Sequence, residues 1–337
     1  LSSVIPSDKF VWFAYLGLFF PLLILVQFGF VIFWITRRKW LFLISLGVLL
    51  LSFPAVNRVF TLPLHKNHLV AEEKPIIKLL TYNVAIFGGE KEFDNIMKII
   101  ENADADIVCL QEFGFYTRHN LLTEYQVLSR FSKTYPYRHL WYKNQRNNMS
   151  WGVATFSKYP IIHKEKIEYS SDYNVSIYSD VVIKLDTVRI FNNHLESNKL
   201  TMGDVKHYKS LSDDFSHEKL WRITEKFSYK LGAAYRVRAK QARAIKSSID
   251  ESPYPVVVCG DFNDVPQSYA YRTIAKNLND VKTTTGWGYN YTFNANGMLV
   301  DIDHVLVSKQ DIAPLRYSII RKPFSDHYPV LSEWQVK

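Results

Sequence analysis

Six short segments of this 337-residue chain place carboxylate, amide or imidazole side chains next to an apolar run. They read TYNV at 81–84, CLQE at 109–112, NNHL at 192–195, CGDFND at 259–264, DIDH at 301–304 and SDHYP at 325–329. Side chains of these types bind hard divalent cations, orient water and transfer protons. A single Asp or Asn after a strand is most often a turn or a cap. Six such segments in one chain instead predict that they meet in one polar crevice.

The elements that would position these segments are short strands alternating with helices. We predict strands at 76–84, 106–111, 152–157, 161–169, 175–185, 188–194, 255–260, 302–308, 316–321 and 328–334. Helices are expected at 91–102 and 268–279. A long polar and helical stretch is expected at 199–250, and a tight turn at Asp186-Thr187. Hairpin strands mixed with covering helices predict an α/β fold, a four-layer sandwich of two packed mixed β-sheets flanked by helices.

Together these motifs resemble those of the endonuclease/exonuclease/phosphatase superfamily. This deoxyribonuclease-like fold includes pancreatic deoxyribonuclease, exonuclease-type repair enzymes, inositol polyphosphate phosphatases and bacterial sphingomyelinases. The most specific matches, in the family's order, are QE at 111–112, GDFN at 260–263 and SDH at 325–327, and the resemblance covers about residues 76–334. It implies a metal-dependent hydrolase that acts on phosphoric ester bonds.

The resemblance also implies a metal site. Glu112 and Asp326 match metal-binding acidic residues, and Asn83 matches an asparagine that supports both the metal ion and the phosphate. Such hard oxygen ligands suit Mg²⁺ or Mn²⁺, which neutralise phosphate charge and lower the pKa of bound water. One position departs from the family pattern, because Asp301 stands where an Arg or similar residue is usual, two residues before Asp303. Asp301 would add negative charge near the site or face the solvent.

The remaining matches imply the catalytic roles. Asp261 and Asn263 match the pair that orients the attacking water and contacts the phosphate, and His194 matches a histidine that binds phosphate oxygens. Asp303 and His327 match a carboxylate–imidazole dyad. A histidine held by a carboxylate is oriented and becomes a better cation, so the physical chemistry agrees with these roles.

The first seventy residues have a different character. Residues 10–35 are almost wholly apolar and residues 40–57 carry no charge, with Thr36-Arg37-Arg38-Lys39 between them. The first run would reach about 39 Å as a helix, enough for a tilted crossing of a hydrocarbon core about 30 Å thick. We therefore predict three parts: a transmembrane helical hairpin at 1–60, a linker at 61–75 and a catalytic domain at 76–337.

The basic turn of this hairpin predicts its orientation. Arg37, Arg38 and Lys39 favour the cytoplasmic side, which makes this a multi-pass membrane protein with an extracytoplasmic catalytic domain. Two alternatives are a signal peptide within 37–55, which lacks a clean small-x-small cleavage site, and a hairpin buried in a soluble core. The chain begins with Leu1 rather than Met, which leaves room for an upstream segment.

Charge and cysteine usage limit the function classes. The net charge of +9 is uneven, because residues 1–70 hold six Lys/Arg and one acid, so the chain is not a basic nucleic-acid coat. Cys109 and Cys259 lie in apolar runs and are expected to be reduced core thiols.

Residues 199–246 hold twelve Lys/Arg against five acids. They form either a solvated helix face or a landing surface for anionic phosphate, centred on Arg236, Arg238, Lys240 and Arg243 with Tyr229 and Tyr235 nearby.

Three functions remain open on the residues alone. The chain is a membrane-anchored nuclease-like phosphodiesterase, a lipid or inositol-phosphate phosphoesterase with the same site, or an inactive anchored binding module. The shared motifs handle the phosphate and not the group attached to it. The expected partners are the phosphate-ester substrate and, through the hairpin, the membrane, and no obligate protein partner is evident. Aromatic residues that could rim the crevice, or belong to the core, are Trp141, Trp151, Trp287, Tyr289 and Tyr291.

Overall fold

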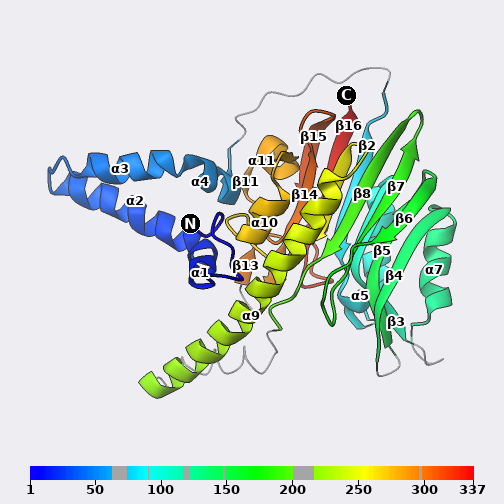
Figure 1. Cartoon of the computed structure of the whole chain (residues 1–337), viewed down its shortest axis with the longest axis horizontal. Helices are drawn as coiled ribbons and strands as arrows, with labels where there is room; N and C mark the ends of the chain where they lie inside the picture. The colour runs from blue at the N-terminus through cyan, green and yellow to red at the C-terminus, as the bar shows by residue number, and fades with distance from the viewer. Residues whose placement is uncertain (63–73, 90, 117–121, 147–148, 200–215, 296–297) are drawn as a thin grey trace.

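The computed structural model describes residues 1–62, 74–89, 91–116, 122–146, 149–199, 216–295 and 298–337. Two six-stranded sheets pack face to face, and helices lie on both outer faces (Figure 1). The predicted α/β sandwich of two mixed sheets is confirmed.

Each sheet contains one parallel pair of strands among antiparallel neighbours. In the first sheet β2 and β3 are parallel, and the strand order is β15 (Ile312–Ile319), β16 (Val330–Val336), β2 (Ile77–Asn83), β3 (Ile107–Tyr116), β5 (Met149–Ser157) and β4 (Tyr137–Arg146). In the second sheet β8 and β9 are parallel, and the order is β10 (Leu278–Asp280), β14 (Asp303–Ser308), β9 (Val256–Asp261), β8 (Asp186–His194), β7 (Ser176–Ile183) and β6 (Ile161–Lys166).

The alternation of side chains along the strands builds three apolar layers. Leu79 packs in the core between the sheets, while its neighbour Leu80 packs on the opposite face of β2. That outer face is covered by α6 (Phe93–Ala103) and α7 (Glu124–Ser132). The outer face of the second sheet is covered by α9 (His217–Asp250) and α10 (Tyr269–Ile274). Because successive residues of a strand point to opposite faces, sheets covered on both faces need strands that are apolar throughout.

The two cysteines confirm the predicted central core. Cys109 and Cys259 are both free thiols with no exposed surface, and both belong to the apolar layer between the sheets. Trp334 lies in the same layer and is the largest fully buried side chain among the described residues.

Two local predictions need correction. The tight turn lies at 184–185 rather than at Asp186-Thr187, because Lys184 takes the left-handed backbone (φ 56°) and both predicted turn residues belong to β8. The helix predicted at 268–279 ends at Ile274, and β10 follows it. Strand β4 and helix α7 were not predicted. The remaining short elements are α5 (Ala85–Gly89), α11 (Val281–Thr285), β1 (Phe60–Thr61), β11 (Gly288–Tyr289), β12 (Phe293–Ala295) and β13 (Met298–Val300).

The two apolar N-terminal runs are each broken into a pair of helices. Helix α1 (Trp12–Leu18) meets α2 (Phe20–Thr36) at 67°, and α3 (Phe42–Leu51) meets α4 (Phe53–Val59) at 66°. Pro21 and Pro54 stand in the first turn of α2 and α4, where a residue without an N–H begins a helix rather than continues one. Among the described residues no single helix has the length and apolarity to cross a membrane, and only the two bent pairs match by length and composition.

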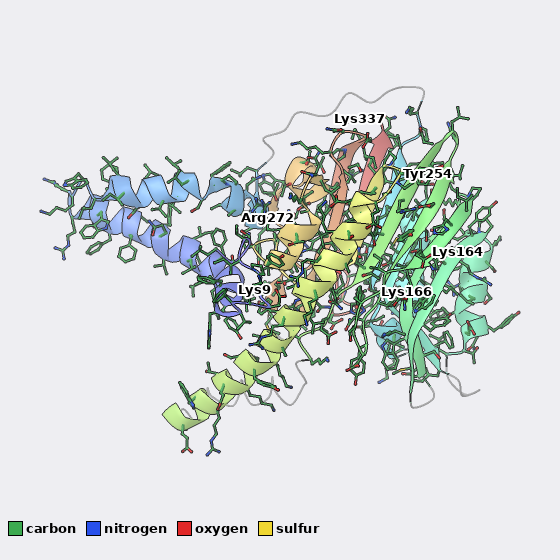
Figure 2. The ribbon with its side chains drawn as sticks, in the orientation of Figure 1. Lys9, Lys164, Lys166, Tyr254, Arg272 and Lys337 are labelled. Carbon is green, nitrogen blue, oxygen red and sulfur yellow. The ribbon has the colours of Figure 1, made fainter. Side chains whose placement is uncertain are left out.

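Helices α2 and α3 form a hairpin that points away from the sheets (Figure 1). Their side chains spread outward around the hairpin (Figure 2). Leu25 is 68% exposed and Leu50 is 65% exposed, and in α2 only Val31 is buried. These exposures do not match the alternative of a hairpin buried in a soluble core.

The segments at the base of the hairpin contact the sandwich. The Ser7 hydroxyl donates to the carbonyl of Tyr235 (3.0 Å), and the Tyr15 hydroxyl donates to the carbonyl of Ser228 (2.6 Å), both on α9. Thr61, which begins the predicted linker, pairs with Gly288 as part of β1 and β11. Of that linker, residues 63–73 lie outside the described part of the chain.

Candidate active site

Asn83 and Glu112 enter the site from the parallel strands of the first sheet. Asn83 ends β2 and is paired in register with Gln111 of β3. A bulge after Gln111 gives Glu112 a left-handed backbone (φ 47°), a conformation that costs about 1–3 kcal/mol and often occurs at functional sites. The Asn83 Nδ2 donates to Oε1 of Glu112 (3.4 Å) and to Oδ2 of Asp261 (3.0 Å). One amide therefore holds two carboxylates that come from different sheets.

His194 and Asp261 end the parallel strands of the second sheet, where they are register partners. Gly260 precedes Asp261 with φ 125°, and a Cβ there would lie 2.0 Å from the carbonyl oxygen of Asn193. Only glycine lets β9 lie this close to β8 at that residue. In the following turn, the backbone N–H of Asn263 donates to Oδ1 of Asp261 (2.7 Å), and its Nδ2 donates to Oδ2 (3.2 Å). The GDFN motif thus orients one carboxylate toward the crevice.

Asp303 and His327 complete the group. Asp303 begins β14 and is the antiparallel register partner of Asp261. The His327 Nδ1 lies 2.8 Å from Oδ2 of Asp303, and its Nε2 lies 3.7 Å from Oδ2 of Asp261. The Phe293 ring packs edge-on against the imidazole with centroids 5.0 Å apart. The carboxylate–imidazole contact expected from the sequence is therefore present.

Burial and charge give these groups different protonation states. Burial raises the pKa of Asp261 to about 6, against the lowering effect of the His327 charge. Burial alone would lower the pKa of His327, but the carboxylates of Asp303 and Asp261 outweigh it and raise this pKa to about 10. Burial lowers the pKa of His194. At pH 7 the site therefore holds a charged Asp261, a protonated His327 and a neutral His194.

The donor set fits a divalent cation. Burial raises the pKa of Glu112 and the charge of Asp326 raises it further, and together they outweigh the lowering effects of the His327 charge and the Asn83 hydrogen bond. The Nε2 of His194 is buried and has no hydrogen-bond partner among the described residues, and it lies 3.8 Å from Oε1 of Glu112 and 3.7 Å from Oδ2 of Asp261. A hard cation would neutralise the Glu112 carboxylate, and a water bound to it would give the His194 nitrogen a hydrogen-bond partner. The Asn83 oxygen accepts from the backbone N–H of Ala85 (3.1 Å), while its Nδ2 donates to both carboxylates.

A second group of acidic and imidazole side chains also has metal-like spacing. The ligand atoms of Asp261, Asp303 and His327 lie within 4.8 Å of one another. The His327 Nδ1 is already engaged by Asp303, so this trio forms an ion-paired unit as it stands. The predicted ligand Asp326 is exposed beside it and accepts a hydrogen bond from the Ser325 hydroxyl (3.3 Å).

Asp301 is buried and does not face the solvent, which was one of the two sequence expectations. It is buried, and its carboxylate pairs with the Lys282 ammonium, while Nδ1 of His304 lies 4.0 Å away. Lys282 also donates to the carbonyl of Arg58 (2.9 Å) at the end of α4. Lys282 of α11 therefore neutralises the extra negative charge, and it also connects this region to the N-terminal helices.

The predicted basic landing surface is smaller than expected. Arg238 points inward, is 1% exposed and donates to Oδ2 of Asp264 (3.1 Å). Arg243 is paired with Asp8 (2.6 Å). Within this cluster, exposed cations without a described ion pair are Arg236 and Lys240. Residues 200–215 of the basic stretch lie outside the described part of the chain.

Of the five aromatic residues that could rim the crevice, Trp151 lines an open pocket next to Glu112 and His194. Trp141 is 39% exposed and does not line that pocket, and the Nζ of Lys166 of β6 lies 5.2 Å from its ring centroid. Trp287, Tyr289 and Tyr291 do not line that pocket. Sequence reasoning missed other pocket residues, among them Tyr173 and Asn174, because they lie in a loop with no motif to mark them.

Comparison with known proteins supports this architecture. Residues 80–327 match the sequence model of the Endonuclease/Exonuclease/phosphatase family, and residues 1–59 match a domain of unknown function, DUF8431. A search of curated proteins found no match. The solved structures that the chain resembles include the human Nocturnin catalytic domain with a bound sulfate anion, at 18% identity, with 78% of this chain and 94% of that chain covered and a TM-score of 0.52.

Two bacterial structures give similar values. One is an endonuclease/exonuclease/phosphatase family protein from Bacteroides thetaiotaomicron, at 16% identity, with 78% of this chain and 99% of that chain covered and a TM-score of 0.52. The other is the beta toxin of Staphylococcus aureus, at 20% identity, with 76% and 99% covered and a TM-score of 0.52. At these identities the likeness concerns the fold.

Proposed function

This chain belongs to the endonuclease/exonuclease/phosphatase family, and we propose that it cleaves the phosphodiester bonds of nucleic acid with Mg²⁺ or Mn²⁺. The family consists of divalent-metal-dependent hydrolases of phosphoester bonds, so the chain is a hydrolase of this type. We propose three further points: the bond cleaved is a phosphodiester, the substrate is nucleic acid and the ion is Mg²⁺ or Mn²⁺.

The observation that supports it most is the Nε2 of His194, which lies between two carboxylates and has no hydrogen-bond partner within the described ranges. This atom lies 3.8 Å from Glu112 and 3.7 Å from Asp261, too far for a hydrogen bond to either. A buried imidazole nitrogen without a partner costs free energy unless a ligand completes it. A phosphate oxygen between this nitrogen and a cation on Glu112 would accept a hydrogen bond from the nitrogen and also bind the cation.

The protein groups then divide the work of hydrolysis. Charged Asp261, held by the amides of Asn83 and Asn263, accepts a proton from the attacking water. Neutral His194 donates from Nε2 to a phosphate oxygen. His327 stays protonated through Asp303 and stabilises the negative charge that develops on the phosphate.

Glu112 and Asp326 would hold the divalent cation. The ion would supply Lewis-acid stabilisation of the phosphate charge. In this structure the N–H donors of both site asparagines point at protein acceptors, since the Nδ2 of Asn263 also donates to the carbonyl of Leu195 (3.0 Å). Their predicted contacts to phosphate would therefore need one of these bonds to be exchanged.

The proposal includes attachment to a membrane by the hairpin of α2 and α3. The support is the exposure of apolar side chains around a hairpin that ends in Arg37, Arg38 and Lys39. By the positive-inside rule these cations stay cytoplasmic, which leaves the catalytic domain outside. Full-length protein should float with vesicles after carbonate washing, and a Lys39→Cys thiol should resist an impermeant reagent added outside intact cells. Release by carbonate, or rapid labelling of that thiol, would contradict this part.

Hydrolysis is tested with single-stranded DNA, plasmid DNA and phospholipid vesicles, each with Mg²⁺, Mn²⁺ or EDTA. We expect DNA cleavage that needs the metal and falls by about 10²–10⁴ in Asp261→Asn, since an acid–base residue contributes that much. Asp94→Asn is the matched control, because Asp94 lies on α6 with its side chain 76% exposed.

Two results would refute the proposal. Release of lipid phosphate with intact DNA would assign the site to lipid esters. Activity that persists unchanged in Asp261→Asn would show that these residues do not perform the reaction.

A further inference from the structure

An open pocket of about 330 Å³ lies directly beside the phosphate end of the site. Glu112 and His194 form one side of it, so a group bound here adjoins any phosphate held by those residues. Its other walls come from separate elements: Ile86 from the left-handed turn α5, Trp151 from β5, and Lys199 from the loop after β8. Its volume is in the range of small-ligand sites.

Two flat aromatic rings face this pocket. The Trp151 and Tyr173 rings lie 6° from parallel, with centroids 6.5 Å apart. Tyr173 is 37% exposed, so its ring remains accessible to a ligand. Aromatic side chains of this kind stack unpaired bases in single-stranded nucleic acid.

One residue that lines the pocket carries a buried hydrogen-bond acceptor with no partner in the described part of the chain. Asn174 lines the pocket and is 2% exposed, and its Oδ1 is buried without a hydrogen bond among the described residues. Its backbone is fixed separately, because the Asn174 N–H donates to the Ser171 hydroxyl (3.1 Å). An unsatisfied buried carbonyl costs free energy, and the side-chain amide of asparagine matches the donor–acceptor edge of a base.

A lysine ammonium already lies beside one aromatic face of the pocket. The Lys199 Nζ lies 5.2 Å from the centroid of the Tyr173 ring and 2.7 Å from Oε1 of Glu196. The aromatic face that a quaternary ammonium group would use therefore already has a cation beside it. A neutral base meets no such repulsion at this face of the Tyr173 ring.

We infer that this pocket binds one unpaired nucleobase of the strand that is cleaved, stacked on Trp151 and Tyr173 and hydrogen-bonded to Asn174. The inference rests on the proposed function and narrows it, because the enzyme then acts on single-stranded or locally unpaired nucleic acid. Trp151 and Tyr173 would be specificity-determining residues for the base next to the scissile phosphate.

The test compares a single-stranded oligonucleotide with the same oligonucleotide carrying an abasic residue on either side of the cleaved bond. Trp151→Ala should raise KM for the base-containing substrate about ten-fold or more, as expected for the loss of base stacking, and should change KM for the abasic one little. Trp141→Ala is the matched control, since Trp141 lies on the neighbouring strand and outside the pocket. Equal effects of Trp151→Ala on both substrates, or an equal effect of Trp141→Ala, would overturn the inference.

A binding measurement separates this inference from the proposed function. Full-length Asp261→Asn in EDTA is titrated with a short single-stranded oligonucleotide and with its abasic form, and binding is followed by anisotropy. Tighter binding of the base-containing strand, lost in Asp261→Asn/Trp151→Ala, would support the pocket even if hydrolysis of DNA were absent. Equal binding of both strands would refute it. Loss of phosphocholine-vesicle hydrolysis in Trp151→Ala, with no effect on oligonucleotides, would also refute it and assign the pocket to a lipid headgroup.

Discussion

Replacing Arg238 by methionine should lower the free energy of unfolding by about 3–5 kcal/mol, the usual cost of breaking a buried ion pair by removing one partner. The Arg238 Nε donates to Oδ2 of Asp264, and one terminal nitrogen donates to the carbonyl of Glu196 and to Oδ1 of Asn198, both at 2.9 Å. Methionine retains an apolar stem of similar length. The change therefore isolates the charge and its hydrogen bonds.

The magnitude depends on Asp264, which loses its cation. Burial already raises the pKa of Asp264, and Arg238 opposes that rise, so the pKa should rise further in the variant. Protonation then relieves the unpaired charge, and the destabilisation should shrink as the pH falls toward 4. The double variant Arg238→Met/Asp264→Asn should recover part of the loss at pH 7, because no buried charge is left unpaired.

The assay is urea unfolding of the full chain in detergent, followed by near-UV circular dichroism at pH 7 and pH 5. Arg236→Met is the matched control, since Arg236 is an exposed arginine of the same helix. Arg238 holds the segment after His194, so folded Arg238→Met protein should also lose activity through kcat. A loss of stability below about 1 kcal/mol, or no recovery in the double variant, would refute the reasoning.

Three further predictions concern the charges of the site. In metal-free Asp303→Asn protein, the pKa of His327 should be at least two units below its value of about 10 in the wild type. NMR titration of the imidazole measures this pKa, and an unchanged value would contradict the Asp303–His327 dyad. Because the folded-state pKa of His327 is raised, protonated His327 stabilises the folded protein fully below about pH 6.5, and this contribution is lost as the pH rises toward 10. The urea midpoint should therefore fall over that pH range in the wild type and fall less in Asp303→Asn. Glu112→Gln should weaken Mg²⁺ binding at least ten-fold by calorimetry, because a neutral amide replaces a carboxylate ligand; equal affinity would place the ion elsewhere.

The sandwich and most of its strands could be predicted because the residue pattern that marks a strand lies within that strand. Period-two alternation and continuous apolar runs such as 256–259 mark strands wherever they lie in the chain. The missed turn at Lys184 shows the limit of such local rules, since a lysine there takes a left-handed backbone that Asp or Asn more often adopts. The proline breaks at Pro21 and Pro54 were visible in the sequence, but hydropathy alone merged each pair of helices into one span.

The chemistry of the site followed from residue types, whereas its surroundings did not. Carboxylate, amide and imidazole groups at strand ends converge because parallel β2 and β3, and parallel β8 and β9, end at the same edge of the sandwich. The sequence did not reveal that Arg238 is buried or that Asp301 is neutralised by Lys282. Those outcomes depend on which side chain from another element lies opposite, and no local pattern encodes that choice.

By itself the sequence determined most of the strands, the apolar hairpin and the set of groups able to hydrolyse a phosphoester, since each of these depends on residue type and short-range order. Only the tertiary structure decided the protonation states of Asp261 and His327, the inward direction of Arg238 and the aromatic pocket beside Glu112. The physical reason is that burial and Coulomb interactions act through space between residues far apart in the chain. Their strength is set by the folded arrangement alone.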